Sequence, residues 1–248
     1  HEDGHSHILA GTIPNCITYD PTFGYEVAVI VRDGLRRMFV DQEDVYYYLT
    51  VCNENYHHPA MPDGTERRID KCLYQFSRTE APTAKHVNLV SSGTIFQQAM
   101  QAAEMLKADF GITADLWVAT SMNELAREAQ DVERLNRMHP TSAPKVPYVT
   151  EVPSKATGPV IAVTDYMKNY AEQIRGFVPQ SYHVLGTDGF GRSDSRVALR
   201  RHFEVDGNHI AATAVYALFK EGKVTAAEVE AAYAKYAIDP AKINPRIA

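Results

Sequence analysis

The alternation of short apolar runs with amphipathic stretches, over the last two thirds of the chain, restricts the fold more than any other sequence feature. Four runs rich in apolar and β-branched residues predict strands, at residues 87–91, 115–120, 160–164 and 183–185. Segments with helical periodicity lie between and after them, at residues 95–110, 121–138, 165–175, 194–203, 208–220 and 226–236. Strands that alternate with helices predict an α/β fold with a mostly parallel sheet flanked by helices.

Local signals support these boundaries. Gly111 follows the first of the helices, where a left-handed C-terminal stop is typical. Ser121 and Glu124 have the spacing of a capping box at the start of the second helix. Residues 77–85 lose all periodicity and contain a proline, so they predict a linker in front of the alternating region.

The part before this linker is less regular. Residues 8–17 predict an extended, proline-containing segment. Asp20 and Pro21 are typical of a helix N-cap and of the first helical position, and the apolar spacing over 25–38 predicts the helix itself. The aromatic and β-branched residues 44–51 predict a buried strand.

A polar segment, residues 53–64, follows this strand. Open α/β sheets bind ligands beyond the carboxyl ends of their strands, which makes the segment a candidate substrate-side loop. Its candidate residues carry an amide, a carboxylate, a phenol and an imidazole, and they are Asn53, Glu54, Tyr56 and His57. A polar loop docked on another subunit is an equally good interpretation.

The first seven residues, His-Glu-Asp-Gly-His-Ser-His, concentrate groups that titrate or bind metal near neutral pH. Their spacing does not match the helical H-E-x-x-H pattern of zinc enzymes, and the glycine favours a turn, so we expect no metal bound by the protein here. A purification tag would show consecutive histidines. Because no methionine precedes this cluster, we expect the chain to be part of a larger protein, cut near a functional site.

Composition excludes several classes of function. The net charge is −6, which does not suggest nucleic acid or an anionic membrane as partner, and no apolar run has transmembrane length. The three cysteines have no C-x-x-C spacing and are expected to be reduced thiols in a cytoplasmic protein. The sequence contains no G-x-S-x-G motif, kinase motif or cysteine dyad, which excludes the common hydrolases and phosphotransferases.

A glycine-rich segment, Gly186-Thr-Asp-Gly-Phe-Gly, follows a predicted strand and precedes a helix, as phosphate-binding loops do. It matches neither G-x-G-x-x-G nor G-x-x-x-x-G-K-[ST], and Asp188 would repel a phosphate. A tight turn that needs the conformational freedom of glycine is the better interpretation.

Residues 2–7 are similar to the G-E-D-G-P-T-H signature of transketolases. With other segments they resemble one narrower family, the homodimeric-type pyruvate dehydrogenase component, a thiamine-diphosphate decarboxylase of the transketolase-like superfamily. The segments that carry this resemblance are His1–His7, Ile13–Cys16, Asn53–His57, Met61-Pro62, Leu185–Asp194 and Ile243–Ala248.

The resemblance implies that residues 1–80 are the C-terminal part of a pyrimidine-binding domain and that residues 81–248 are a transketolase C-terminal-type domain. It implies a homodimer that decarboxylates pyruvate and transfers the acetyl group to a lipoyl group of an acyltransferase component. Thiamine diphosphate and Mg²⁺ would be the cofactors of the full-length protein. Because their ligands would lie mostly outside this chain, we expect the chain alone to be inactive.

The resemblance also implies roles for the opening segment. His1 is the first candidate for a substrate-side proton donor, since imidazole titrates near the working pH. His7 matches the substrate-contacting histidine of the transketolase signature, and Asp3 matches its neighbouring carboxylate. Which histidine faces the intermediate stays open, because His1 stands where transketolases have glycine. No cofactor ligand is identified. The alternatives are a non-catalytic assembly or dimerisation module, or a transketolase-like enzyme for another 2-oxo acid or a ketose.

Overall fold

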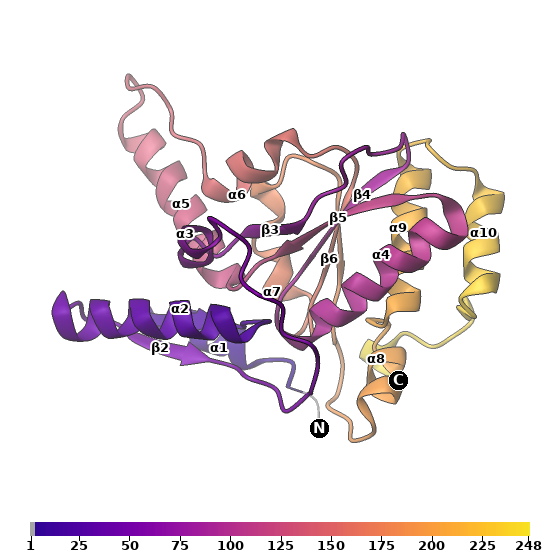
Figure 1. Ribbon diagram of the computed structural model, residues 1–248, viewed down its shortest axis with the longest axis horizontal. Helices are drawn as coiled ribbons and strands as arrows, with labels where there is room; N and C mark the ends of the chain where they lie inside the picture. The colour runs from indigo at the N-terminus through magenta and orange to yellow at the C-terminus, as the bar shows by residue number, and fades with distance from the viewer. Residues whose placement is uncertain (1–2) are drawn as a thin grey trace.

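A computed structural model describes residues 3–248, so that His1 and Glu2 lie outside the described residues. The first part of the chain holds three helices and two short strands (Figure 1). These elements are α1 (Ser6–Gly11), β1 (Cys16–Tyr19), α2 (Gly24–Leu35), β2 (Tyr46–Leu49) and α3 (Glu66–Asp70). We call residues 3–70 the first region.

Strands β1 and β2 of the first region pair in parallel, with Cys16 opposite Tyr46 and Tyr19 opposite Leu49. Helix α2 packs closely on β2, because a Cβ atom at Gly34 would lie 3.0 Å from the ring of Tyr47. Every residue of β1 is buried, whereas β2 is only half-buried. The small sheet therefore has one well-covered strand and one poorly covered strand.

The rest of the chain, residues 74–248, forms the second region, built on a five-stranded sheet. Its strands are β3 (Tyr74–Ser77), β4 (His86–Ser91), β5 (Thr113–Val118), β6 (Val160–Val163) and β7 (Tyr182–Leu185). Their order across the sheet is β3-β5-β4-β6-β7, and all neighbours are parallel except β3, which runs antiparallel to β5. The predicted α/β class with a mostly parallel sheet is confirmed.

Helices cover both faces of this sheet. Helices α4 and α9 lie against one face with α10 outside α9, while α5, α6 and α7 lie on the opposite side (Figure 1). The bounds are α4 (Phe96–Phe110), α5 (Met122–Met138), α6 (Tyr148–Glu151), α7 (Asn169–Glu172), α8 (Arg196–His202), α9 (Gly207–Lys220) and α10 (Ala226–Lys235). Because both faces are covered, β4 and β6 are buried at every position.

The sequence signals explain where two of these helices begin and end. Gly111 adopts φ +62° and terminates α4, in the left-handed conformation that glycine tolerates best. The Ser121 hydroxyl accepts a hydrogen bond from the Glu124 backbone N–H at 3.1 Å and so caps α5. Both helices match the segments predicted for them to within one residue.

Two predictions in the first region are wrong. Residues 6–11 form helix α1 instead of an extended segment, because the Asp3 carboxylate accepts hydrogen bonds from the backbone N–H groups of His5 and Ser6 and starts a helical turn. Asp20 does not cap the next helix either. Helix α2 begins at Gly24, and the Glu26 carboxylate accepts from the N–H group just before it.

Other elements are shorter than predicted or were not predicted. Helix α7 covers only four residues of the stretch 165–175, and helices α3 and α6 and strand β3 were not foreseen. Strand β3 precedes the predicted domain boundary at residue 80 but belongs to the larger sheet, and the boundary itself stays a prediction. None of the helices within residues 3–248 is long and apolar enough to cross a membrane.

Candidate functional site

The two sheets meet at the carboxyl ends of their parallel strands. Asp20, which follows β1, donates its backbone N–H to Thr120 O at 2.8 Å, and its own carbonyl accepts from Gly93 N at 3.0 Å. Side chains that follow β2, β4 and β6 meet at the same place. We call this contact the inter-sheet junction, formed by Asp20, Thr50, Ser92, Gly93 and Tyr166.

The junction lies at the place where a sheet of this topology ordinarily binds a ligand. Strand β4 has β5 on one side and β6 on the other, so the chain changes direction between β4 and β6. The Asp20 side chain occupies this switch point. Its carboxylate accepts hydrogen bonds from the hydroxyls of Ser92 at 2.7 Å, Thr50 at 2.8 Å and Tyr166 at 3.3 Å. The crevice is therefore filled by a carboxylate of the chain itself.

The backbone around Asp20 is shaped for this contact. Gly93 has φ +55°, and a Cβ atom there would lie 2.5 Å from Asp20 Oδ2. A side chain at this position would displace the carboxylate, so the junction requires glycine. Asp20 is 3% exposed, and burial raises the pKa of its carboxyl even though three hydroxyl groups donate to it.

His7 lies beside the junction and is fully buried. Its Nε2 is 2.8 Å from Thr50 Oγ1, and its ring centroid is 4.6 Å from that of Tyr166 and 5.0 Å from that of Tyr170. Burial lowers the pKa of His7 to about 4, although the Asp3 carboxylate opposes the shift. The ring is therefore neutral at pH 7 and enclosed by aromatic side chains.

Asp3 stands one helical turn before His7 but faces outward. Partial burial raises the pKa of its carboxyl, but the hydrogen bonds from Ser6 and His5 outweigh burial and leave the pKa below its usual value. Asp3 is therefore an exposed, ionised carboxylate at the start of α1. His1, the remaining candidate of the opening segment, lies outside the described residues.

The candidate loop that follows β2 is docked on helix α8 of its own chain. The Glu54 carboxylate lies 3.0 Å from an Nη atom of Arg200, and the Asn53 amide oxygen accepts from Arg196. The Tyr56 hydroxyl donates to the backbone carbonyl of Thr22, whereas His57 is exposed. The side chains of Asn53, Glu54 and Tyr56 therefore already have hydrogen-bond partners within this chain.

Arg200 is a functional candidate that the sequence did not suggest. It is 7% exposed, and besides Glu54 it contacts Asp165 at 3.4 Å and the Thr94 hydroxyl at 3.1 Å. Asp165 follows β6 and Thr94 follows β4, so this arginine joins the candidate loop to the switch point. The only signal available in the sequence was that these residues follow predicted strands.

A small hollow of about 100 Å³ lies next to the junction. Its lining includes oxygen-bearing side chains from both regions, among them Asp20, Thr22, Thr50, Glu54 and Thr94. Within residues 3–248 no group of three or more His, Cys, Asp or Glu side chains is arranged to hold a metal ion.

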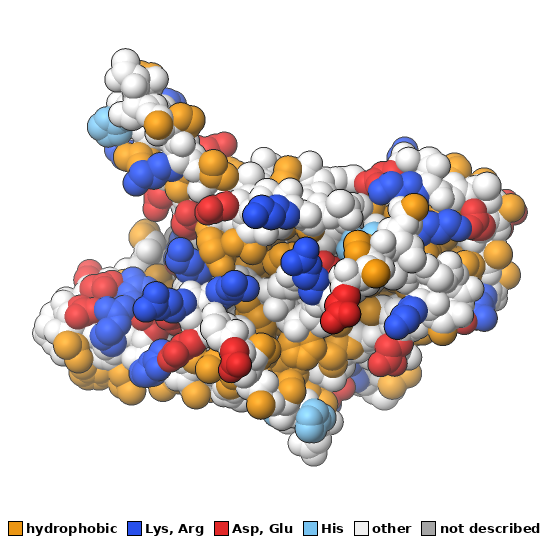
Figure 2. All heavy atoms as spheres, turned by 45° about the horizontal axis from the view of Figure 1, so that its top comes forward, with side chains coloured by type: hydrophobic (Ala, Val, Ile, Leu, Met, Phe, Trp, Pro, Cys, Tyr) orange, Lys and Arg blue, Asp and Glu red, His pale blue; other side chains and the backbone are white. Residues whose placement is uncertain are grey.

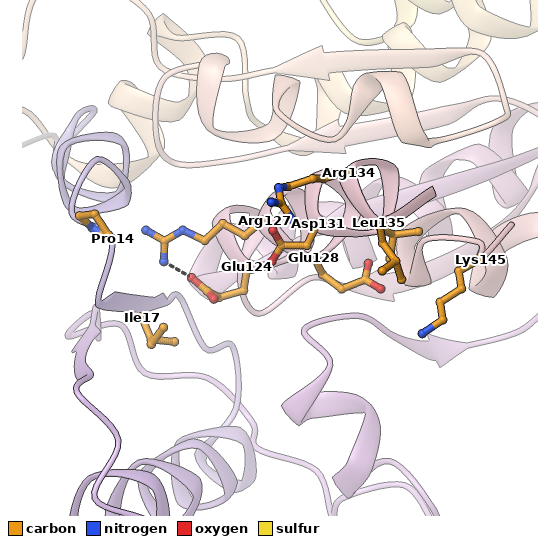
Figure 3. A pocket seen from close by; sticks show the side chains of 10 residues that line it. Pro14, Ile17, Glu124, Arg127, Glu128, Asp131, Arg134, Leu135 and Lys145 are labelled. Carbon is orange, nitrogen blue, oxygen red and sulfur yellow. Dashed lines mark hydrogen bonds and ion pairs between the residues drawn. The ribbon is translucent and has the colours of Figure 1, made fainter. Parts of the chain in front are cut away.

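A broader hollow of about 600 Å³ runs along α5 (Figure 3). Figure 3 shows the α5 side chains Glu124, Arg127, Glu128, Asp131 and Arg134 on one side of it, with Pro14 and Ile17 opposite. Arg127 is bound to Glu124 at 2.7 Å and to three backbone carbonyls, so it holds the neighbouring loop in place. None of the predicted site residues that the structure describes lines this hollow. It is a weaker candidate than the junction.

One face of the molecule carries charged side chains of both signs (Figure 2). Figure 2 shows acidic and basic side chains interspersed on one face of the molecule, without a broad area of a single sign. Two exposed arginines near the end of α2 are paired with carboxylates, Arg32 with Glu66 and Arg36 with Asp33 at 2.8 Å.

Two known domain families match the chain. Residues 1–59 match the middle domain of the pyruvate dehydrogenase E1 component. Residues 73–206 match the transketolase-like C-terminal domain. The first match ends within the polar loop after β2, and the second begins just before β3.

Curated relatives cover the whole chain. It is 55% identical over 99% of its length to the pyruvate dehydrogenase E1 component of Cupriavidus necator, and equally to that of Pseudomonas aeruginosa. It is 52% identical over its full length to the same component of Escherichia coli K12. The chain spans 28% of the length of each of these relatives.

Solved structures share the fold at low sequence identity. A transketolase from Pichia stipitis in complex with sedoheptulose-7-phosphate aligns with a TM-score of 0.61 and 16% identity, over 90% of this chain and 28% of that one. A transketolase from Leishmania mexicana aligns with a TM-score of 0.57 and 14% identity, over 88% and 28% of the two chains. These likenesses establish the arrangement of the strands and helices.

Proposed function

Because the chain belongs to the transketolase-like C-terminal domain family, we propose that it works as part of a pyruvate dehydrogenase E1 component. This enzyme would be an oxidoreductase that decarboxylates pyruvate and transfers the acetyl group to a lipoyl group of an acyltransferase component. The observation that carries the proposal is the 55% identity to curated E1 components, which extends across both regions of the chain.

The proposal includes the cofactors and partners of such an enzyme. Thiamine diphosphate, held with Mg²⁺, supplies the electron-sink chemistry when it is bound. We place the ligands of both mostly outside this chain, since it spans only 28% of the length of its curated relatives. A second copy of the chain and a lipoyl acyltransferase would be the protein partners, in the cytoplasm.

Within this proposal the opening segment contributes to the substrate side. The exposed carboxylate of Asp3 is ionised and held by Ser6, so it is placed to accept hydrogen bonds from outside the chain. His1 would donate protons to the substrate. His7 has no exposed surface, which supports a role in holding the opening segment through α1.

The loop after β2 would act through its exposed member. Glu54 and Asn53 are already bound to arginines of α8, which fixes the backbone of the loop. His57 projects from this fixed backbone with its side chain exposed. We therefore propose His57 as the residue of this loop that meets a substrate or a second subunit.

An assay of the full-length protein tests the function. With thiamine diphosphate, Mg²⁺ and a lipoyl domain, we expect pyruvate-dependent acetylation of the lipoyl group, followed by mass spectrometry. Transfer from a ketose donor without turnover of pyruvate would identify a transketolase-like enzyme instead. Inactivity with both donors would favour the alternative that the protein is a non-catalytic assembly or dimerisation module.

Calorimetry of the 248-residue chain tests the placement of the cofactor ligands. We expect no heat of binding when thiamine diphosphate and Mg²⁺ are titrated into it. Micromolar affinity in this titration would contradict the assignment of the ligands to other parts of the enzyme. The full-length protein, which should bind, is the positive control.

A further inference from the structure

One nitrogen of the buried His7 ring makes a hydrogen bond within the described residues, and the other does not. Nε2 is 2.8 Å from the Thr50 hydroxyl, and that hydroxyl is 2.8 Å from Asp20 Oδ1. Nδ1 is buried and has no hydrogen-bond partner among the described residues. The three side chains form a continuous chain of hydrogen bonds from the inter-sheet junction to helix α1.

The donor and acceptor properties of these groups decide where the protons lie. The hydroxyls of Ser92 and Thr50 donate to Asp20 at 2.7 and 2.8 Å, while the Tyr166 hydroxyl lies 3.0 Å from Thr50 Oγ1 and 3.3 Å from Asp20 Oδ1. Hydrogen bonds from hydroxyl groups favour the ionised form of a carboxyl, and in that form it can only accept. The single proton of Thr50 is therefore directed to Asp20. Thr50 Oγ1 then offers only a lone pair to His7, so that Nε2 of His7 must carry the proton.

Residues of the second region hold Asp20 in the position that this proton arrangement requires. The backbone N–H of Asp20 is held by Thr120 O at 2.8 Å, and its carbonyl is held by Gly93 N at 3.0 Å. These bonds hold the backbone of Asp20, and its side chain cannot turn away from Thr50 without losing the hydrogen bond that the Ser92 hydroxyl donates to Oδ2 at 2.7 Å. The tautomer of a histidine in the first region is thus set from the larger sheet.

We propose that Asp20 is a positioning residue that acts on His7 through the Thr50 hydroxyl, keeps the proton on Nε2 and leaves Nδ1 as the acceptor of the ring. The inference deepens the proposed function and rests on it, because it assigns a purpose to a histidine of the substrate-side segment. A donor from outside the described residues would then make a hydrogen bond to the lone pair of Nδ1. In catalytic triads a buried carboxylate orients a histidine in the same way.

A matched pair of variants in the full-length enzyme tests the contribution of the Thr50 hydroxyl. Thr50→Ser keeps the hydroxyl and should retain kcat within about threefold, whereas Thr50→Val should lower kcat about 10- to 100-fold, as removal of an outer hydrogen-bond partner that orients a functional histidine does in metal sites. The KM for pyruvate should change little in both variants. Equal kcat values for the two variants would overturn the proposal.

Chemical rescue tests the carboxylate itself. Asp20→Ala should lower kcat and leave a cavity lined by the hydroxyls of Ser92, Thr50 and Tyr166. Added formate should restore part of kcat, whereas chloride at the same ionic strength should not. If Asp20→Ala folds, as judged by its melting temperature, and formate has no effect, the carboxylate does not act as proposed.

The tautomer can be observed without any assay of activity. In a protein labelled with ¹⁵N at histidine, the His7 signals, assigned with His7→Gln, should show a protonated Nε2 and an unprotonated Nδ1. Thr50→Val should abolish this preference. A protonated Nδ1 in the wild type would refute the inference. A wild type inactive towards pyruvate but with the expected tautomer would refute the proposed function alone.

Discussion

The two regions of the chain are buried to very different degrees. In the second region, strands β4 and β6 are buried at every residue between two layers of helices. In the first region, β2 is half-buried, and helix α2 and the π-helical turn that follows it (Arg36–Val40) expose apolar side chains, among them Leu35 at 51% and Phe39 at 69%. Exposed apolar patches of this kind mark contact surfaces. The apolar core is centred on the second region and continues into the first region, which is less well covered and carries the candidate chemistry.

The largest expected effect tests whether stability resides in the second region. Ile161 in β6 is fully buried, so Ile161→Ala should lower the free energy of unfolding by about 4 kcal/mol. Val31 on α2 is 45% exposed, and Val31→Ala should change the free energy of unfolding by less than about 0.5 kcal/mol. Urea denaturation of both variants measures the difference. Similar losses would mean that the core is not centred on the second region.

The buried arginine at the boundary provides the next test. Arg200→Met leaves Asp165 without its cation and Glu54 with only the more distant Arg196, which should cost about 3 kcal/mol of stability. Arg196 contacts the same loop, but its side chain is 45% exposed, and Arg196→Met should cost less than about 1 kcal/mol. Melting curves compare the two. If Arg196→Met lowers the melting temperature more than Arg200→Met does, the loop after β2 is held mainly by its contact with the exposed Arg196 and not by the buried Arg200 at the switch point.

A buried carboxyl of the first region should make stability depend on pH. Burial raises the pKa of Glu26 to about 7 despite hydrogen bonds from Tyr74 and the backbone. The folded state therefore holds its proton more tightly than the unfolded state does. The resulting stability, about 3 kcal/mol, is present below pH 4.5 and is lost as the pH rises through about 7.

Replacement of this carboxyl by an amide measures the effect. Glu26→Gln imitates the protonated form and should unfold with a weaker pH dependence between pH 5 and pH 8 than the wild type. His7 contributes with the opposite sign, since its pKa of about 4 makes the folded state lose stability as the pH falls from 6.5 towards 4. Parallel pH profiles of Glu26→Gln and the wild type would show that Glu26 is ionised throughout.

The last prediction separates chemistry from stability. His1→Ala in the full-length enzyme should lower kcat about 100-fold if the residue transfers protons, equivalent to about 2.7 kcal/mol. The melting temperature should not change. Unaltered turnover would remove His1 from the mechanism and would leave Asp3 as the substrate-side group of the opening segment.

The second region was predictable because its structure depends on local patterns. The segments 87–91 and 160–164 are apolar runs of strand length, and both match observed strands to within one residue. Strand β3 was missed because it mixes polar and aromatic residues and pairs through an irregular register between Gln75 and Ser77. An antiparallel edge strand next to a linker leaves little periodicity to detect.

The junction was not predictable from local patterns. Asp20 has the residue type of an N-cap, but its carboxylate is bound to Thr50 and Ser92, which are 30 and 72 residues away in the sequence. The helical spacing of α8 likewise does not reveal that Arg200 is buried. The resemblance to a known family identified Asp3 and His7, but it did not indicate which of the two faces inward.

The place of β3 in the larger sheet has a consequence for the covalent connection between the regions. The segment after it, residues 80–84, is mainly exposed, and a protease would cleave there. After such a nick, the N-terminal piece would still contribute β3 to the sheet of the other piece, with Tyr74 opposite Val118. The two fragments should therefore stay associated, and separately expressed halves should reassemble by strand complementation.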